Sequence, residues 1–382
     1  MLSRRRLGIF LAILLVLVLL WIASRQSVPE INQAAEPIHL SEQLLFLNPL
    51  NSPANLHAYD PLSGQTKTLT TDRAVESFSP APDGLSVYFS EANNQFGKDI
   101  WQLIIGDLST NLLIDCGPQS CANPQASPDG LYLAYTRIND ATGLQQVHLL
   151  EFSSDVDIAL SPADQIAIGP QWSLDGQLSF YNQSLAGYQF QYPGENAQSL
   201  APNALGELLA WLPESNAFIV AEAFAADSDI LRGTTGEASL QTPEPGSQST
   251  LELTVTGLLH FQIGQYSNLF DYGLDLVEDA APVASPNGRW IAFTRKYLDE
   301  ERWTPGRQLW IHEFESGETL PLTASANYQM SAISWSADSS TLAFVRSNRT
   351  DFNAPTEIWI MQPDGSDAHF IAVDAFAPQW LP

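Results

Sequence analysis

The chain has 382 residues, of which 43 are acidic and 16 basic, for a formal charge of −27 at pH 7. A field of this sign repels the phosphates of nucleic acids and of anionic lipid headgroups, so the composition argues against both as partners. It favours a neutral or cation-rich partner, although acidity can also serve only to keep an exported protein soluble.

The N-terminus has the pattern of a membrane anchor. Three arginines, Arg4 to Arg6, precede an apolar run from Leu7 to Ala23. As a helix this run is about 25 Å long, at the lower end for spanning hydrocarbon. We predict a cytoplasmic basic tail at 1–6, an uncleaved anchor at 7–23 and a polar tether at 24–42, with the remainder outside the cytoplasm at the cell surface or in the periplasm. A cleavable export signal is the alternative.

A turn sequence recurs through the rest of the chain about every 40 to 50 residues. Asp or Asn bonds its own backbone and Gly accepts positive φ, so each copy predicts a tight connection between antiparallel strands. The copies are Pro82-Asp83-Gly84, Pro128-Asp129-Gly130, Leu174-Asp175-Gly176 and Pro286-Asn287-Gly288, with weaker ones at 213–216 and 337–340.

Two strand-like runs, rich in aromatic and β-branched residues, follow each turn. The first run aligns at 87–89, 133–135, 178–180, 218–220, 291–293 and 342–344. The second aligns at 100–101, 147–148, 188–189, 259–260, 309–310 and 358–359. A weaker last strand is visible at 66–69 and 321–323. Four strands per unit at this period are the signature of a β-propeller blade.

The two ends of the repeat region each hold part of a unit. The first unit supplies strands at 44–47, 56–59 and 66–69 but no innermost strand, and the chain ends in a lone strand at 377–380. Pairing the two ends would complete one blade and remove an exposed sheet edge. We therefore predict an all-β propeller of seven four-stranded blades over 43–382, closed by its N- and C-terminal strands, with six or eight blades as alternatives.

The repeat resembles that of TolB-like, WD-repeat-related propellers. The resemblance rests on Ser-Pro-Asp-Gly followed by Leu-Ala-Tyr-Thr-Arg at 127–137 and on Ser-Pro-Asn-Gly-Arg-Trp-Ile-Ala-Phe-Thr-Arg at 285–295. It implies a propeller fold. The α/β domain that precedes the propeller in TolB has no counterpart here, so a TolB role in the cell envelope does not transfer. Similar propellers cover the active site of prolyl oligopeptidase-type peptidases, whose hydrolase domain has no room in this chain.

Cys116 and Cys121 are the two cysteines of the chain. Outside the cytoplasm they predict a small disulfide-closed loop, with free thiols or a metal site as the weaker alternatives.

The longest interval between turns contains residues 225–250, which are rich in Ala, Ser, Thr, Gly, Pro and Glu and predict a mobile insertion. Other long connections, at 92–99, 138–146, 296–308 and 347–357, occupy the same place between the second and third strands. Such connections share one face of a propeller, so we predict a binding face there, against the alternative of neutral surface drift.

One polar position recurs just after the second strand of each unit. It holds Asn48, Glu91, Arg137, Asn182, Glu222, Arg295 and Arg346. If the arginines point to the channel mouth they can grip a carboxylate or sulfate, so Arg137, Arg295, Arg346, Glu91 and Glu222 form a candidate ligand-binding ring. The alternative is ion pairing between neighbouring blades, for example with Glu91 or Glu222.

The histidines do not point to chemistry. His57, His148 and His260 share a third-strand position with Trp101, Trp310 and Trp359, which indicates packing, and His39, His312 and His369 lack metal-ligand spacing. No phosphate loop, metalloprotease pair or nucleophile elbow is present, so no catalytic residue, metal or cofactor is predicted.

The sequence therefore predicts a membrane-anchored extracytoplasmic propeller that binds a protein, peptide or glycan. An enzyme of the glycan lyase or hydrolase type, using the channel mouth, is the alternative. A third hypothesis is a domain whose main partner is a neighbouring membrane protein. Converging His, carboxylate and Arg side chains in the centre would favour the enzyme, and exposed aromatic side chains on the long loops would favour the binding module.

Overall fold

The fold is known from a computed structural model, which describes residues 42–50, 53–200, 204–213, 217–226, 253–262, 265–270 and 276–382. These residues belong to one compact unit, Leu40–Pro382. The predicted tail, anchor and nearly all of the tether lie outside the described residues, as does the insertion from residue 227 onward. Within the described part of the chain, no helix is long and apolar enough to cross a membrane.

The described residues form strands, and a single 3₁₀ turn, η1 (Gln183–Leu185), is the one helical element among them. The strands before it are β1 (Leu44–Asn48), β2 (Asn55–Asp60), β3 (Gln65–Thr68), β4 (Val75–Pro80), β5 (Ser86–Ala92), β6 (Lys98–Ile104), β7 (Thr110–Ile114), β8 (Ser120–Ala126), β9 (Tyr132–Ile138), β10 (Gln145–Glu151), β11 (Val156–Ala159), β12 (Ala167–Trp172) and β13 (Leu178–Asn182).

The strands that follow η1 continue the same order. They are β14 (Gly187–Gln191), β15 (Gln198–Leu200), β16 (Ala204–Trp211), β17 (Ala217–Ala226), β18 (Leu253–Gln262), β19 (Gln265–Asn268), β20 (Val277–Ala284), β21 (Trp290–Tyr297), β22 (Gln308–Glu313), β23 (Thr319–Pro321), β24 (Tyr328–Trp335), β25 (Leu342–Asn348), β26 (Glu357–Met361), β27 (His369–Val373) and β28 (Phe376–Trp380).

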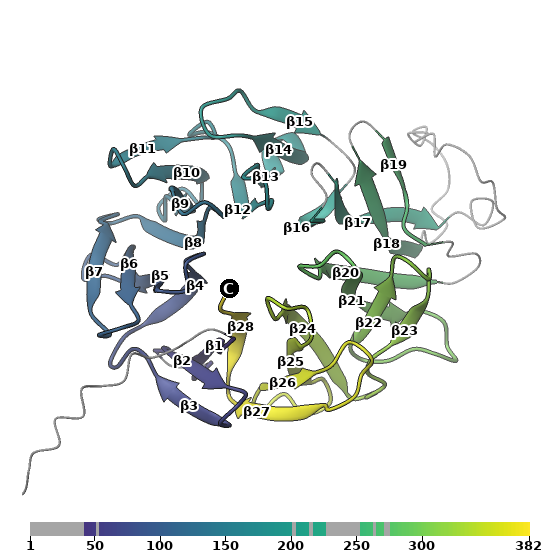
Figure 1. Ribbon diagram of the computed structural model, residues 1–382. Coiled ribbons are helices and arrows are strands. Elements are labelled where there is room, and N and C mark those ends of the chain that lie inside the picture. The colour runs from purple at the N-terminus through teal and green to yellow at the C-terminus, as the bar shows by residue number, and fades with distance from the viewer. Residues whose placement is uncertain are drawn as a thin grey trace, which may run out of the picture. The chain divides into compact units, whose positions relative to one another are not determined.

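The strands assemble into a β-propeller. Five sheets follow one another around a centre, with β4, β8, β12, β16, β20, β24 and β28 innermost (Figure 1). Three sheets have four strands and two have eight. Within each eight-stranded sheet, one parallel pair joins two antiparallel halves, Lys98 opposite Ser120 in one and Thr256 opposite Glu278 in the other.

The predicted closure of the ring is present. The C-terminal strand β28 pairs antiparallel with β1, with Leu44 opposite Trp380 and Leu47 opposite Phe376. The sheet order is β28-β1-β2-β3, so the last strand of the chain is the innermost strand of the first sheet. The Gln379 amide also donates to the carbonyl of Phe78 in the next sheet, at 2.9 Å.

The predicted turns and strand runs fall where the repeat places them. The two aligned apolar runs lie in the second strands (β5, β9, β13, β17, β21 and β25) and the third strands (β6, β10, β14, β18, β22 and β26). In the turns, the Asp83 carboxylate accepts the backbone N–H of Leu85 and that of Asp129 accepts the N–H of Leu131. Gly84 and Gly130 have φ of +66° and +70°, which a side chain would disfavour.

A β-bulge recurs in the innermost strands, and it was not predicted from the sequence. Register shifts interrupt the pairing of each of them with its second strand, for example between Ala122 and Gln125 in β8. The bulged residue adopts a left-handed conformation at Asn123, Gly169, Ala281, Ala332 and Ala377. Bulges increase local twist, which suits strands that converge on a narrow channel.

The core lies between neighbouring sheets. The closing sheet packs Leu44, Phe46 and Trp380 against Val345 and Ile358 of the β24–β27 sheet. Similar clusters fill the other junctions, so each sheet is buried only when its neighbours are present.

Candidate functional site

The predicted polar ring occupies one equivalent position in the fold. Arg137, Arg295 and Arg346 lie in the second strands β9, β21 and β25, opposite Cys121, Asp279 and Met330 of the innermost strands. Glu91 in β5 is likewise opposite Val75. These residues lie inside the second strand rather than just after it, because ladder pairing continues past the apolar run. Asn48 and Asn182 are the last residues of β1 and β13. The backbone of Glu222 pairs with Ala204 and Gly257, and its side chain is not among those that the structure describes.

Arg295 forms an ion pair with a buried carboxylate. Its Nε and Nη2 each donate to one oxygen of Asp279 at 2.7 Å, in the two-bond geometry that favours arginine over lysine. Asp279 has no exposed surface, and the guanidinium carbon lies 5.0 Å from the centre of the Trp310 ring. Removing either charge would deprive the other, which is buried, of this two-bond contact.

Arg346 is held in the same manner in the next sheet. Its Nε and Nη2 lie 2.9 and 2.8 Å from Oε2 of Glu357. The guanidinium lies between two rings, 4.1 Å from the centre of Tyr328 and 4.3 Å from that of Trp359. Trp359 Nε1 also donates to Glu357, so cation, ring and carboxylate fix one another.

Glu91 forms its ion pair with Arg73, which precedes β4. The Arg73 guanidinium lies 4.6 Å from the centre of the Trp101 ring and also donates to the Thr110 hydroxyl. As around Arg346, a guanidinium lies on a tryptophan ring and pairs with a carboxylate. Here the carboxylate, Glu91, has the second-strand position, and the cation comes from Arg73.

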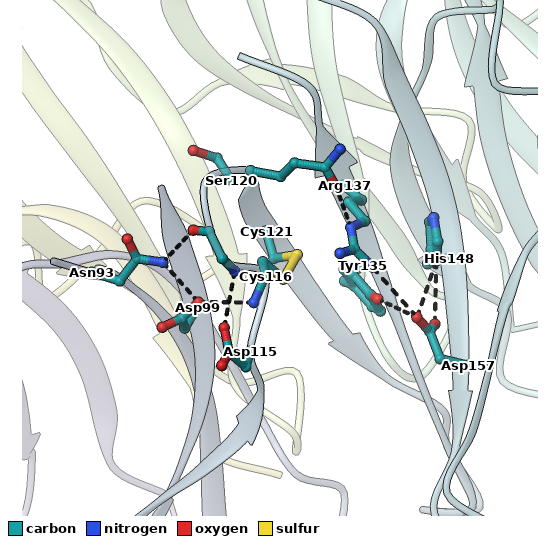
Figure 2. The surroundings of a disulfide bond; sticks show 12 residues. Asn93, Asp99, Asp115, Cys116, Ser120, Cys121, Tyr135, Arg137, His148 and Asp157 are labelled. Carbon is teal, nitrogen blue, oxygen red and sulfur yellow. Dashed lines mark hydrogen bonds and ion pairs between the residues drawn. A yellow bond between two sulfur atoms is a disulfide. The ribbon is translucent and has the colours of Figure 1, made fainter. Parts of the chain in front are cut away.

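Arg137 belongs to a network beside the disulfide (Figure 2). Its Nε donates to Oε1 of Gln119 at 2.6 Å, and Nη1 lies 3.9 Å from Asp157. Asp157 also accepts the Tyr135 hydroxyl at 2.9 Å and contacts Nδ1 of His148 at 3.2 Å.

The network sets the protonation of its members. Burial alone would raise the pKa of Asp157, but the hydrogen bonds from His148 and Tyr135, with the charge of Arg137, outweigh it and lower the pKa. Burial, reinforced by the Asp157 charge, raises the pKa of Tyr135, which therefore remains a neutral donor. Asp157 lies in the outermost strand β11, so this cluster is away from the channel.

These contacts agree with the alternative that the arginines form ion pairs within the protein, but the pairs do not join neighbouring blades. The carboxylate partners Asp279, Glu357 and Asp157 come from the same run of four strands as their arginines, not from a neighbouring blade. An exogenous carboxylate or sulfate at this ring stays a prediction, and it would have to compete with these internal partners.

The shared Trp and His position is more than packing. Trp101, Trp310 and Trp359 each carry a guanidinium on one face. The His148 ring lies 5.3 Å from that of Tyr135, tilted by 34°, and His57 stacks on Phe46. In the sequence, the third-strand aromatic position and the second-strand polar position were recognised as two separate repeated positions. Both occur in the same units, and this was the signal that could have predicted their contact.

The connections between second and third strands carry exposed aromatic side chains. We call these connections, at 93–97, 139–144, 298–307 and 349–356, the loop rim. Antiparallel strands place them on one face of the propeller, and the turns that follow first and third strands on the other, which we call the turn face. On the loop rim Phe96 is 99% exposed, Phe352 81% and Trp303 53%. A cation lies near two of these rings, Lys296 at 5.1 Å from Trp303 and Arg349 at 6.0 Å from Phe352.

Phe96 sits on a rigid support. Asn93 Oδ1 accepts the N–H groups of Gln95 and Gly97, and its Nδ2 donates to Asp99 and to the carbonyl of Gly117. Phe96 itself has φ of +65°, which is rare for a bulky residue.

Beneath this loop, Cys116 and Cys121 form the predicted disulfide (Figure 2). The closed loop presses on Gly97, where a Cβ would lie 2.2 Å from the carbonyl oxygen of Gln119. The disulfide loop therefore fixes the segment that presents Phe96. Among the described residues, no group of His, Cys, Asp and Glu side chains is placed to hold a metal ion.

Comparison with known structures places this geometry among propellers. TolB from Acinetobacter baumannii superposes with a TM-score of 0.52 at 14% identity, over 90% of this chain and 67% of that one. A prolyl endopeptidase superposes with a TM-score of 0.59 at 12% identity over 88% of this chain, which spans half of that protein's length. The β-propeller domain of the Trilobed protease from Pyrococcus furiosus gives a TM-score of 0.55 at 10% identity, over 87% and 95% of the two chains.

These similarities define the fold. The chain has a TolB-like β-propeller fold, as the repeat implied. The Pyrococcus domain is described as having an open velcro topology, whereas β28 and β1 pair in this chain. No family model matches the sequence, and no curated protein matches it.

Proposed function

We propose that the chain is a propeller of seven four-stranded blades that binds a protein, peptide or glycan through its loop rim. The blade count follows if each eight-stranded sheet is divided at its single parallel pair. Every resulting unit then has an innermost strand, a bulge and three antiparallel partners.

The exposed aromatic side chains carry the binding proposal. Phe96, Trp303 and Phe352 project from the loop rim of three different sheets, and aromatic anchors of this kind dominate the energy of interfaces. Rings also stack on the apolar faces of sugars, so the same surface suits a glycan. The support beneath Phe96 reduces the entropy lost when a partner immobilises it.

The enzyme alternative requires converging groups in the centre. The cluster that unites His148, Asp157 and Arg137 lies instead across β9, β10 and β11, the three strands outside the innermost strand β8. The exposed rings of the loop rim therefore favour the binding module over the enzyme.

Photo-crosslinking in intact cells tests the binding face. The photoreactive amino acid p-benzoylphenylalanine replaces Phe96 or Phe352 in the full-length chain, and Leu62 in the control. Leu62 is 91% exposed in the turn between β2 and β3, on the turn face. Crosslinked adducts from positions 96 and 352 but not 62 are expected. Adducts only from position 62, or none after irradiation at any position, would contradict the proposal.

We also propose that residues 7–23 anchor the chain, with the propeller outside the cytoplasm and the neighbouring membrane available for a second, membrane-embedded partner. The arginines before the apolar run support this orientation. Protease is added to intact cells, or to spheroplasts where the cell has an outer membrane, and is expected to cut within 225–250. Cutting only after the cytoplasmic membrane is lysed would place the propeller on the cytoplasmic side.

A further inference from the structure

A pocket on the turn face combines aromatic walls with carboxylates. It has a volume of about 250 Å³ and lies between the β8–β11 and β12–β15 strands. Its walls include Tyr132, Trp172 and Tyr192, and its rim includes Asp129 and Asp175. This volume is below that of sites for drug-sized ligands, so it suits a group the size of one side chain.

The walls are fixed in place. The rings of Tyr132 and Trp172 have centres 6.5 Å apart at an interplanar angle of 29°. Trp172 Nε1 donates to the carbonyl of Gln125 across the junction of the two sheets, at 3.0 Å. The Tyr192 hydroxyl donates to Oδ2 of Asp175 at 2.8 Å, which orients both the ring and the carboxylate.

The carboxylate of Asp175 stays ionised well into the acid range. Burial alone would raise its pKa, but hydrogen bonds from Ser173 and Tyr192 outweigh this and lower it. A negative charge beside aromatic faces is a favourable environment for an organic cation.

The equivalent junction between two other sheets shows which kind of side chain lies against these rings. Between the β20–β23 and β24–β27 strands, Trp290 and Trp335 occupy the places of Tyr132 and Trp172, with ring centres 6.0 Å apart. Trp335 Nε1 donates to the carbonyl of Val283 at 3.0 Å, as Trp172 does to Gln125.

At that second junction an arginine of the chain itself covers the ring. Arg289 follows the turn glycine Gly288, and its guanidinium carbon lies 4.5 Å from the centre of Trp290. At the first junction the corresponding residue after Gly130 is Leu131, which is exposed. Arg289 also pairs with Glu313, which lies opposite Trp290 in β22. The second junction therefore has a guanidinium of the chain on its aromatic wall, whereas the first has Leu131 in the corresponding place and Asp129 in place of Asn287.

The charge of the turn face adds to this difference. Its turns carry Asp83, Asp129, Asp175, Asp338 and Asp364, and Arg289 is the basic residue among the described turns. A surface of one sign raises the local concentration of oppositely charged groups and their rate of association.

We infer that the pocket at Tyr132, Trp172 and Tyr192 binds an arginine side chain of a partner polypeptide, its guanidinium placed against the rings and beside Asp129 and Asp175. The site lies on the face opposite to the loop rim, so it is independent of the proposed function. A partner bound there docks with a basic residue, and the loop rim remains open for another.

Peptide titration tests the inference. The probe is a glycine pentapeptide with one central arginine, and its control has citrulline, which is neutral and of the same shape. Binding to the full-length protein is followed by saturation-transfer NMR of the peptide. The arginine peptide is expected to bind at least tenfold more tightly than the citrulline peptide. Equal binding of the two would overturn the inference.

Two substitutions of Leu131 locate the site. Leu131→Arg copies the second junction and is expected to occupy the pocket, weakening arginine-peptide binding at least tenfold. Leu131→Gln is a neutral control of similar length and is expected to stay within twofold of wild type. Because Leu131 is exposed, both variants are expected to fold, and circular dichroism checks this. Unchanged binding to the Leu131→Arg protein would exclude this pocket.

Free acetyl-arginine amide distinguishes the source of the cation. Contacts of the flanking backbone predict weaker binding of this compound than of the pentapeptide. Equal affinity would assign the pocket to a small organic cation and overturn the polypeptide partner.

Discussion

At the scale of single residues, aromatic rings and charges meet at repeated positions of the propeller. The same third-strand position carries a ring in most sheets, and the rings at Trp101, Trp310 and Trp359 each hold a guanidinium that is also paired with a carboxylate. Where the ring is His148, Asp157 contacts its Nδ1, and Tyr135 lies opposite it as Phe89 lies opposite Trp101. The chain thus reuses one geometry with different side chains.

Asp157→Asn tests the Tyr135–Asp157–His148 network. Losing the charged acceptor is expected to lower the free energy of unfolding by about 1–2 kcal/mol, the low end for charged hydrogen bonds because Asp157 is partly exposed. Urea denaturation measures this. Asp155→Asn is the control, since that exposed residue has φ of +55°, which Asn tolerates.

The pH dependence of the Asp157→Asn effect has a definite sign. The pKa of Asp157 is lower in the folded state than in the unfolded one, so its contribution is complete above the unfolded value of about 3.9. The stability difference between wild type and variant is expected to shrink as pH falls from 5 toward the folded pKa. A difference that grew with acidity would contradict this account.

Ala332→Gly tests the bulge of the innermost strands. Ala332 is exposed and has φ of +48°, a conformation that costs an L-residue about 1 kcal/mol. The substitution is expected to raise the free energy of unfolding by up to about 0.5 kcal/mol after the entropy of glycine is subtracted. Ala326→Gly, in an exposed loop without this conformation, should not stabilise the chain.

At the scale of elements, the disulfide loop and the first segment of the loop rim form one structure. Asn93 reaches Gly117, Lys98 donates its N–H to the carbonyl of Gln119, and Cys116 donates its own to Asp99. The loop that presents Phe96 therefore depends on residues from a different connection. The β9–β10 loop is held through hydrogen bonds within itself at Asn139 and through the Ser120 hydroxyl, which donates to Asp140.

Gly97→Ala tests the close contact of these two loops. The added methyl group would lie 2.2 Å from the Gln119 oxygen and 2.5 Å from that of Gly117, so one backbone must move. Thermal and urea unfolding are expected to show a loss of about 1–3 kcal/mol. Gly106→Ala is the matched control, because nothing lies within 4 Å of a Cβ there. Equal stability of the two variants would contradict the contact.

At the scale of the whole molecule, the ring depends on its last strand. β28 supplies Trp380 to the closing sheet, and Leu381, just beyond it, is 1% exposed. Without them β1 would have an open edge and the core between the closing sheet and β24–β27 would face water.

Deletion of residues 377–382 is therefore expected to unfold the ring or to lower its Tm sharply. Two large buried side chains are lost, each worth about 1.5–3 kcal/mol, in addition to the β28–β1 ladder. Deletion of Pro382 alone, which is exposed, is the control. Differential scanning calorimetry compares the variants, and an unchanged melting curve for the longer deletion would refute closure by β28.

The sequence by itself determined the repeat, the strand columns and the turns, and it favoured the pairing of the chain ends and the disulfide over their alternatives. These features are local or periodic, since turn chemistry and alternation of apolar residues act within a few positions of the chain. The incomplete units at 44–69 and 377–380 also complete one blade when they pair with each other, so that neither leaves an open sheet edge.

Only the tertiary structure decided which side chains meet. Arg295 pairs with Asp279 and Arg73 with Glu91 because neighbouring strands bring them into register, and no spacing along the chain records that choice. The pocket at Tyr132 and Trp172 arises between two sheets whose residues are about 40 positions apart, one repeat in the period of such folds. Contacts between repeats depend on how the sheets pack, whereas the repeats themselves depend only on local sequence.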